Sequence, residues 1–258
     1  MFSPNLKITF LGTGTSSGVP MIACECEVCK SENTKDKRYR SSILVESDTT
    51  TLVVDTTPDF RSQMLRAGVK KLDAILFTHS HKDHVAGLDD VKAFNYFHQQ
   101  PMKVYANALT EMALRREFAY AFEESKYPGV PDIQIHQIDQ QAFRVGDIEV
   151  QPILVWHHKM PVLGFRFGRF TYITDANRID ADQKEKIRGS EMLVLNALRK
   201  EKHLSHFTLQ EAIDLVDELH IPKGYFTHIS HQLGKHDEVT LQLPEGKQLA
   251  FDGLVLNC

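Results

Sequence analysis

T-H-S-H-K-D-H, at residues 78–84, follows the apolar run D-A-I-L-F at residues 73–77. The apolar run is short and bounded by polar residues, which predicts a buried strand. Three histidines and one aspartate then fall within six positions. Imidazoles and carboxylates are the side chains that cations such as Zn²⁺ and Mn²⁺ accept as ligands. Two interpretations follow: a polar turn that is rich in histidine, or a metal-binding loop at the end of a strand.

Ionisable residues also follow three other apolar runs. His157 and His158 come after I-L-V-W, Asp175 comes after F-T-Y-I-T, and His228 comes after G-Y-F-T. The carboxyl ends of strands form the edge at which open α/β sheets place their active sites. Two divalent ions about 3.5–4 Å apart need several such ligands. Four strand ends with the same feature favour a metal site over a polar turn.

A second cluster is formed by cysteines. Cys24, Cys26 and Cys29 stand in C-E-C-E-V-C, and Cys258 is the last residue. Cysteines this close in sequence do not easily form disulfides with one another, and clustered thiols are more typical of a metal site. Structural zinc is almost always four-coordinate, so three thiolates predict a fourth ligand elsewhere. The alternative is three free cysteines in a loop.

Composition sets further limits. The 258 residues carry a formal charge of −4 and predict a single domain over residues 1–258. No apolar run approaches the roughly 20 residues that span a bilayer, and M-F-S-P-N-L-K lacks the features of a secretory signal. We therefore expect a cytoplasmic protein without a membrane partner, and the mild negative charge argues against nucleic acid.

The order of predicted elements is strands, helices, strands, helices, which predicts a layered α/β sandwich. S-I-L-V-E and T-L-V-V-D predict a hairpin. Helices are predicted at residues 58–67, beginning at Pro58, and near residues 88–98, 108–124 and 209–219. The charged segment at residues 30–40 is predicted to be a solvated loop.

H-S-H-K-D-H resembles the H-x-H-x-D-H signature of the metallo-β-lactamase superfamily, and the later His, Asp and His match its remaining ligands in order. L-G-T-G-T-S-S-G-V-P, C-x-C-x₂-C and T-H-I-S-H resemble the PhnP-like phosphodiesterase branch of that superfamily. The resemblance implies a four-layer αββα sandwich and a dinuclear metal-dependent hydrolase. It also makes a homodimer plausible.

The resemblance implies a ligand set for each of two divalent ions, Zn or Mn. His79, His81 and His157 would bind one ion, Asp83, His84 and His228 the other, and Asp175 would bridge them. At the third position H-x-K favours His157, with Lys159, whereas the spacing to Gly164 favours His158; we choose His157. A structural zinc would be bound by Cys24, Cys26, Cys29 and His231.

Between two such ions a water would lose a proton near neutral pH and become the nucleophile. Asp83 would bind an ion and orient this nucleophile. His206, in H-L-S-H-F-T, is the candidate acid for the leaving alkoxide. The alternative is that Thr208 or Ser205 caps a helix and His206 is merely exposed.

The expected substrate is a small or cyclic phosphodiester. A tRNA-processing-type nuclease and a thioester or lactone hydrolase are alternatives, but no long basic insertion supports the nuclease. A metal-binding protein without catalysis would be expected to lack a ligand, and here every ligand position is filled. Asp55 and Asp59, in D-T-T-P-D-F, either contact metal-binding histidines or serve in a turn and a cap.

Overall fold

The computed structural model describes residues 4–123, 127 and 129–258. Two seven-stranded sheets lie face to face. One contains β1 (Lys7–Gly12), β2 (Ser42–Glu46), β3 (Thr51–Val54), β4 (Ala74–Leu76), β5 (Met102–Ala106), β6 (Ile133–Gln137) and β14 (Val255–Asn257). The other contains β7 (Phe143–Val145), β8 (Ile148–His157), β9 (Met160–Phe167), β10 (Phe170–Tyr172), β11 (Met192–Asn196), β12 (Lys223–Thr227) and β13 (Lys247–Leu249).

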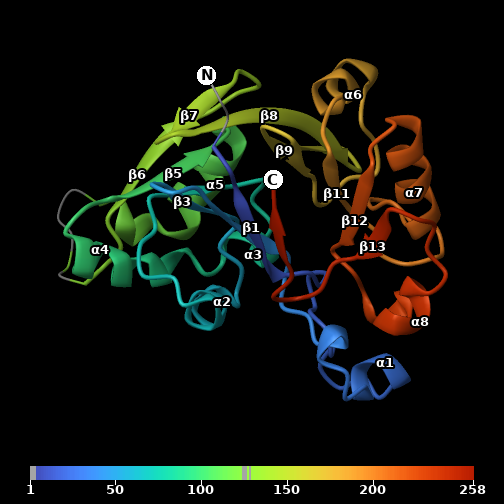
Figure 1. Cartoon of the computed structure of the whole chain (residues 1–258). Coiled ribbons are helices and arrows are strands. Elements are labelled where there is room, and N and C mark those ends of the chain that lie inside the picture. Colours follow the sequence, from blue (N-terminus) through green and yellow to red (C-terminus); the bar gives the residue numbers. More distant parts are fainter. Residues whose placement is uncertain (1–3, 124–126, 128) are drawn as a thin grey trace.

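Helices cover the outer faces of both sheets (Figure 1). The helices of the described residues are α1 (Glu27–Lys30), α2 (Phe60–Ala67), α3 (Lys82–Val85), α4 (Lys92–His98), α5 (Ala108–Glu117), α6 (Ala181–Ile187), α7 (Leu209–Glu218) and α8 (His236–Thr240), of which α1 projects away from the sheets. Short 3-10 helices are η1 (Thr34–Asp36), η2 (Leu88–Val91), η3 (Ala119–Ala121) and η4 (His231–Leu233). Within the described residues, none of the helices is long and apolar enough to cross a membrane.

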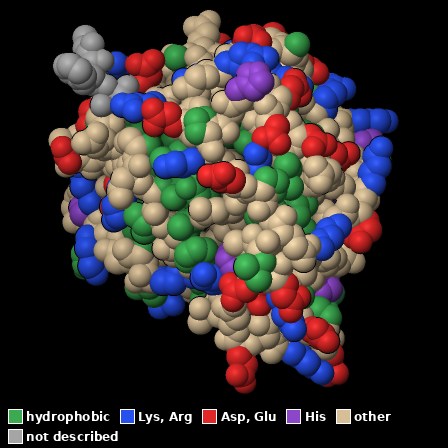
Figure 2. All heavy atoms as spheres, turned by 45° about the vertical axis from the view of Figure 1, so that its right-hand side comes forward, with side chains coloured by type: hydrophobic (Ala, Val, Ile, Leu, Met, Phe, Trp, Pro, Cys, Tyr) green, Lys and Arg blue, Asp and Glu red, His purple; other side chains and the backbone are tan. Residues whose placement is uncertain are grey.

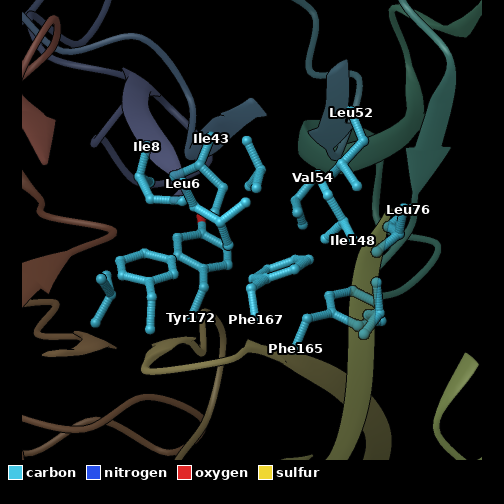
Figure 3. Close-up of a cluster of buried hydrophobic side chains, with 14 of the residues drawn as sticks. Leu6, Ile8, Ile43, Leu52, Val54, Leu76, Ile148, Phe165, Phe167 and Tyr172 are labelled. Carbon is cyan, nitrogen blue, oxygen red and sulfur yellow. The ribbon is translucent and has the colours of Figure 1, made fainter. Parts of the chain in front are cut away.

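Three apolar clusters separate the four layers. Ile8 and Val54 of the first sheet meet Phe165 and Tyr172 of the second in the central cluster, where all four are fully buried (Figure 3). A second cluster lies between the first sheet and α2, η2 and α5. A third lies between the second sheet and α6 and α7. These clusters confirm the predicted αββα sandwich.

Strand direction brings the candidate residues to one edge. β3, β4, β5 and β6 run parallel, and so do β10, β11, β12 and β13. β8 is antiparallel to β9, which is antiparallel to β10, so β8 and β10 point the same way. The carboxyl ends of β8, β10 and β12 therefore share an edge of the second sheet, as those of β3 and β4 do in the first.

Two predicted helices have different bounds in the structure. The helix predicted from Pro58 begins at Phe60 with Asp59 at its N-cap, so Pro58 lies outside it. The helix predicted at residues 108–124 ends at Glu117, and Ala119–Ala121 form a 3-10 turn. Residue 124 lies outside the described residues.

The charged segment at residues 30–40 is a solvated loop only in part, because Asp36 and Arg38 are buried with 1% and 4% of their surfaces exposed. Asp36 accepts hydrogen bonds from the Ser31 hydroxyl and the main-chain nitrogen of His236. The Arg38 guanidinium donates to the Thr13 hydroxyl at 2.8 Å. Burial is tolerated because each charged group has polar partners.

Candidate metal centres

The backbone at three strand ends adopts a conformation that few residues accept. Asp55 follows β3, Asp175 lies beyond β10 and His228 follows β12, with φ angles of 67°, 47° and 55°. Positive φ is uncommon outside glycine, although Asp, Asn and His adopt it more often than most residues. Such strained residues cluster at functional sites, where the surrounding structure holds them in place. The three residues lie at the edge where the candidate ligands gather.

Asp175 lies between two candidate ligand sets. Its Oδ2 is 2.8 Å from His84 Nε2, and its Oδ1 is 3.1 Å from His228 Nε2. Asp83 Oδ2 is 3.2 Å from His84 Nε2. Ligand atoms of His79, His84 and Asp175 lie within 4.8 Å of one another, and so do those of Asp83, His84 and His228. Asp175 also groups with His157 and His206 in this way, so it lies against His79 and His157 of one proposed ligand set and against His84 and His228 of the other.

His79, His81 and His157 also come together. The ring centroids are 4.6 Å apart for His79 and His81, 5.2 Å for His81 and His157, and 5.8 Å for His79 and His157. His158 is exposed, and its main-chain nitrogen donates to the side chain of Asn177. The structure therefore brings His157 to the cluster, which is the choice made from the sequence.

A network of hydrogen bonds fixes how these imidazoles are turned. His84 Nδ1 donates to Asp55 Oδ2 at 2.7 Å. His79 Nδ1 donates to Thr78 Oγ1 at 2.9 Å, and Thr78 Oγ1 in turn donates to Asp55 Oδ2 at 2.8 Å. His157 Nδ1 donates to the Ser205 carbonyl at 2.8 Å. Such contacts select the tautomer that leaves Nε2 for a metal ion.

These residues fit a bound cation. His79 Nε2 is buried and has no hydrogen-bond partner among the described residues, which is costly unless something else occupies the position. Burial lowers the pKa of His79 well below its usual value, so its imidazole is uncharged and able to bind a metal. For His84, burial also opposes charge, but Asp175, Asp83 and Asp55 outweigh it and raise the pKa well above its usual value. The site thus attracts positive charge.

Of the two aspartates in D-T-T-P-D-F, Asp55 is the one that contacts these histidines. It is fully buried and accepts hydrogen bonds from His84 and Thr78. Asp59 instead forms an ion pair with Arg40, whose Nη1 donates to both of its carboxylate oxygens, and it makes no side-chain cap on α2.

His206 is buried inside the cluster, with only 8% of its surface exposed. Its ring centroid is 4.6 Å from that of His157 and 4.9 Å from that of His228, and its Nδ1 is 3.5 Å from Asp175 Oδ1. Burial is the main cause that lowers the pKa of His206 to about 3. Thr208 does cap α7, but His206 is not exposed, so the alternative weighed from the sequence is only half right.

The cysteine cluster has its fourth member. Ligand atoms of Cys24, Cys26, Cys29 and His231 lie within 4.8 Å of one another, and His231 Nδ1 is 3.3 Å from the sulfurs of Cys24 and Cys26. The hydrogen bond with His231 is the main cause that lowers the pKa of Cys26 to about 6. Three thiols and one imidazole match a tetrahedral zinc site. His231 lies three residues after His228, so this cluster joins the protruding segment around α1 to the edge with the other candidate ligands (Figure 1).

Some contacts at the site carry no signal in the sequence. Thr15 Oγ1 lies 3.3 Å from His228 Nε2, and Thr174 Oγ1 lies 3.4 Å from His228 Nδ1. The Thr15 and Ile229 main chains are hydrogen-bonded at 3.0 Å. The glycine-bearing loop that contains Thr15 therefore lies against the loop of His228, but threonines in such loops are too common to single out.

Comparison with known proteins places this chain in a family. Residues 50–229 match the family model described as the beta-lactamase superfamily domain. An octanoyltransferase of Porphyromonas gingivalis is 36% identical over 252 residues, which cover 96% of this chain and 51% of that protein. The chain spans about half or less of the length of the curated relatives it matches.

Solved structures give a full-length match. A new diphosphatase from the PhnP family is 40% identical, with a TM-score of 0.94, and the match covers 100% of this chain and 98% of that one. Zn²⁺-bound PqqB from Methylobacterium extorquens shares the fold at 20% identity, with a TM-score of 0.79 and coverage of 98% and 100%. From the superfamily model and the full-length match together, the chain belongs to the β-lactamase superfamily and, within it, to the PhnP family.

Proposed function

We propose that this chain is a two-metal hydrolase that cleaves a small or cyclic phosphodiester. The observation that carries the proposal is the position of Asp175 between the two ligand sets: its carboxylate lies 2.8 Å from His84 and 3.1 Å from His228 of one set, and within 4.8 Å of the ligand atoms of His79 and His157 of the other. The PhnP-family relative is named a diphosphatase, and this name also supports a substrate that contains phosphate.

In this proposal His79, His81 and His157 hold one ion, and Asp83, His84 and His228 hold the other. The ions are Zn or Mn, and the cysteine cluster holds a structural zinc. Bound ions would lower the pKa of a water molecule and neutralise the charge that develops on phosphorus. Proteins of one fold act on many substrates, so the substrate of this chain depends on the residues at its site.

The residues of this chain would manage the protons. The Asp83 side chain is only 14% exposed and lies beside His84, where it would orient the attacking water. His206 is uncharged near pH 7, because its pKa is lowered to about 3. It would take up the proton released by the water and deliver it to the leaving oxygen. One oxygen–phosphorus bond forms, another breaks, and the proton ends on the alcohol.

A small substrate is favoured over a nucleic acid. On the face seen in Figure 2, acidic and basic side chains are interspersed rather than gathered into one basic surface. The formal charge of −4 points the same way. A second candidate is cleavage of a diphosphate, which the name of the PhnP-family relative favours.

The test combines elemental analysis with an assay. We expect two ions at the His/Asp site, one zinc at the cysteine cluster, and hydrolysis of bis(p-nitrophenyl) phosphate. Turnover of organic diphosphates without turnover of phosphodiesters would replace the first candidate by the second. Turnover of thioesters or lactones alone would overturn both.

A further inference from the structure

A large cavity adjoins the candidate metal centre. Its volume is about 930 Å³, which lies near the upper end of the roughly 300–1,000 Å³ typical of ligand pockets. It is lined by the first residues of α5, by the connection between β6 and β7, and by the paired strands β8 and β9. No residue proposed above as a metal ligand belongs to the lining.

The walls of the cavity are continuous with the metal centre. The main-chain nitrogen of Leu163, which lines the cavity, donates to the Thr78 carbonyl at 3.0 Å, and Thr78 immediately precedes His79. Leu154 also lines the cavity and pairs with Leu163. It lies three residues before His157, or about 10 Å along the strand. A ligand in the cavity would therefore lie beside the chain segment that leads into His79.

The cavity wall ends a stack of aromatic rings. The Phe143 ring lies parallel to the Tyr105 ring, with centroids 5.0 Å apart and planes at 14°. The Tyr105 ring is stacked in the same way on His136, at 4.9 Å and 18°. Phe143 is half-buried and lines the cavity, so a further planar ring could extend the stack.

The polar part of the lining is almost uncharged. Asn107, Gln137 and Gln141 supply amide groups, and Asp139 contributes the one carboxylate among the lining residues that the structure describes. That lining includes no lysine or arginine. The cavity therefore suits an uncharged ring with hydrogen-bonding edges better than it suits a phosphate.

We propose that this cavity binds the base of a nucleoside phosphodiester while the phosphate lies at the metal centre. The proposal rests on the proposed function and narrows its substrate class. Phe143 would stack on the base, and the amide side chains would contact its edge. These are residues for specificity, and none of them touches the reacting atoms.

Two substrates test the proposal directly. Thymidine 5′-(p-nitrophenyl) phosphate and methyl p-nitrophenyl phosphate release the same phenolate and differ in the nucleoside. We expect kcat/KM to be roughly 5-fold or more higher for the thymidine ester, mainly through KM, because stacking of one base on one aromatic ring gives at least this gain. Saturation-transfer NMR with thymidine alone supplies a readout that does not depend on turnover.

Variants locate the effect. Phe143→Leu keeps an apolar side chain without the ring and should abolish the preference for the thymidine ester. Leu109→Glu places a carboxylate in the cavity at a residue that is 57% exposed, in the first turn of α5. Met112→Glu is the matched control, because Met112 is 69% exposed on the same helix but does not line the cavity. Only the first two variants should lose both the preference and the NMR signal, with hydrolysis of the methyl ester unchanged.

Equal kcat/KM for the two esters, without an NMR signal from thymidine, would overturn the proposal. A preference that survives in both Phe143→Leu and Leu109→Glu would overturn it as well, because the base would then bind elsewhere. If neither ester is hydrolysed, the proposed phosphodiesterase function fails. The NMR signal and its loss in Leu109→Glu then still decide whether the cavity binds the base.

Discussion

Replacement of Asp55 by Asn should weaken metal binding more than it weakens the fold. Asp55 accepts hydrogen bonds from His84 Nδ1 at 2.7 Å and from the nitrogen and hydroxyl of Thr78 at 2.9 and 2.8 Å. Asn has the same shape and tolerates the positive φ of 67°. Its amide offers one acceptor oxygen without the charge, so the interaction that orients His84 and polarises its ring is weakened.

The expected magnitude follows from the position of Asp55 behind the proposed ligand. Loss of such a partner typically costs about 10–100-fold in metal affinity, which is about 1.4–2.7 kcal/mol. In the metal-free protein the effect should be smaller, because burial already raises the pKa of Asp55 and so disfavours its charged form.

The assay is a competition titration of Mn²⁺ or Zn²⁺ against a chelator, with urea unfolding of the metal-free protein as its companion. Asp59→Asn is the control, since Asp59 lies four residues away and pairs with Arg40 instead of a histidine. Metal affinity equal to that of the parent in Asp55→Asn, or an equal loss in both variants, would refute the role inferred for Asp55.

Four further predictions concern separate parts of the molecule. Cys26→Ala should lower the metal content by one ion and the Tm, measured by elemental analysis and calorimetry, while Cys258→Ala, outside the cluster, should change neither. Asp83→Asn should reduce kcat by about 100-fold or more with the fold retained by circular dichroism, and near-parent activity would contradict its proposed role in orienting the nucleophile. His206→Gln should slow esters of alkyl alcohols by about 100-fold or more and p-nitrophenyl esters far less; equal losses would argue against a proton donor. Arg38→Met should cost about 3–5 kcal/mol in urea unfolding, because Asp36 and Asp252 would lose the buried cation beside them.

The sequence predicted the layers and the residues that gather at the site because both follow from local patterns. His79, His157, Asp175 and His228 each stand at the end of an apolar run, and the strand directions bring those run ends to one edge. His157 and His158 are harder to separate, since a shift of one residue along a strand reverses the face of every side chain. The structure settles their positions through the register of β8 and β9, in which His157 lies opposite Met160.

What the sequence could not predict depends on contacts between distant segments. Arg38 was expected in a solvated loop because most charged runs are exposed, but its partners include the Ala250 carbonyl, 212 residues away. The sequence around His206 is equally typical of an exposed residue before a capped helix. His206 is buried because His157 and His228, which are distant in the sequence, lie against its ring. No local pattern reports such neighbours.

The positive φ angles of Asp55, Asp175 and His228 link the chemistry of the centre to the stability of the fold. Glycine at any of these positions would relieve a backbone cost of about 1–2 kcal/mol and would delete a proposed ligand or its partner. The same replacement at Asp55 would leave the buried nitrogen and hydroxyl of Thr78 and His84 Nδ1 without their acceptor, so these hydrogen bonds offset the cost of the backbone conformation. The backbone also restricts exchange at these positions to the few residues that tolerate it, chiefly Asp, Asn, His and Gly. The repertoire of side chains at this edge is thus limited by conformation as well as by affinity for metal.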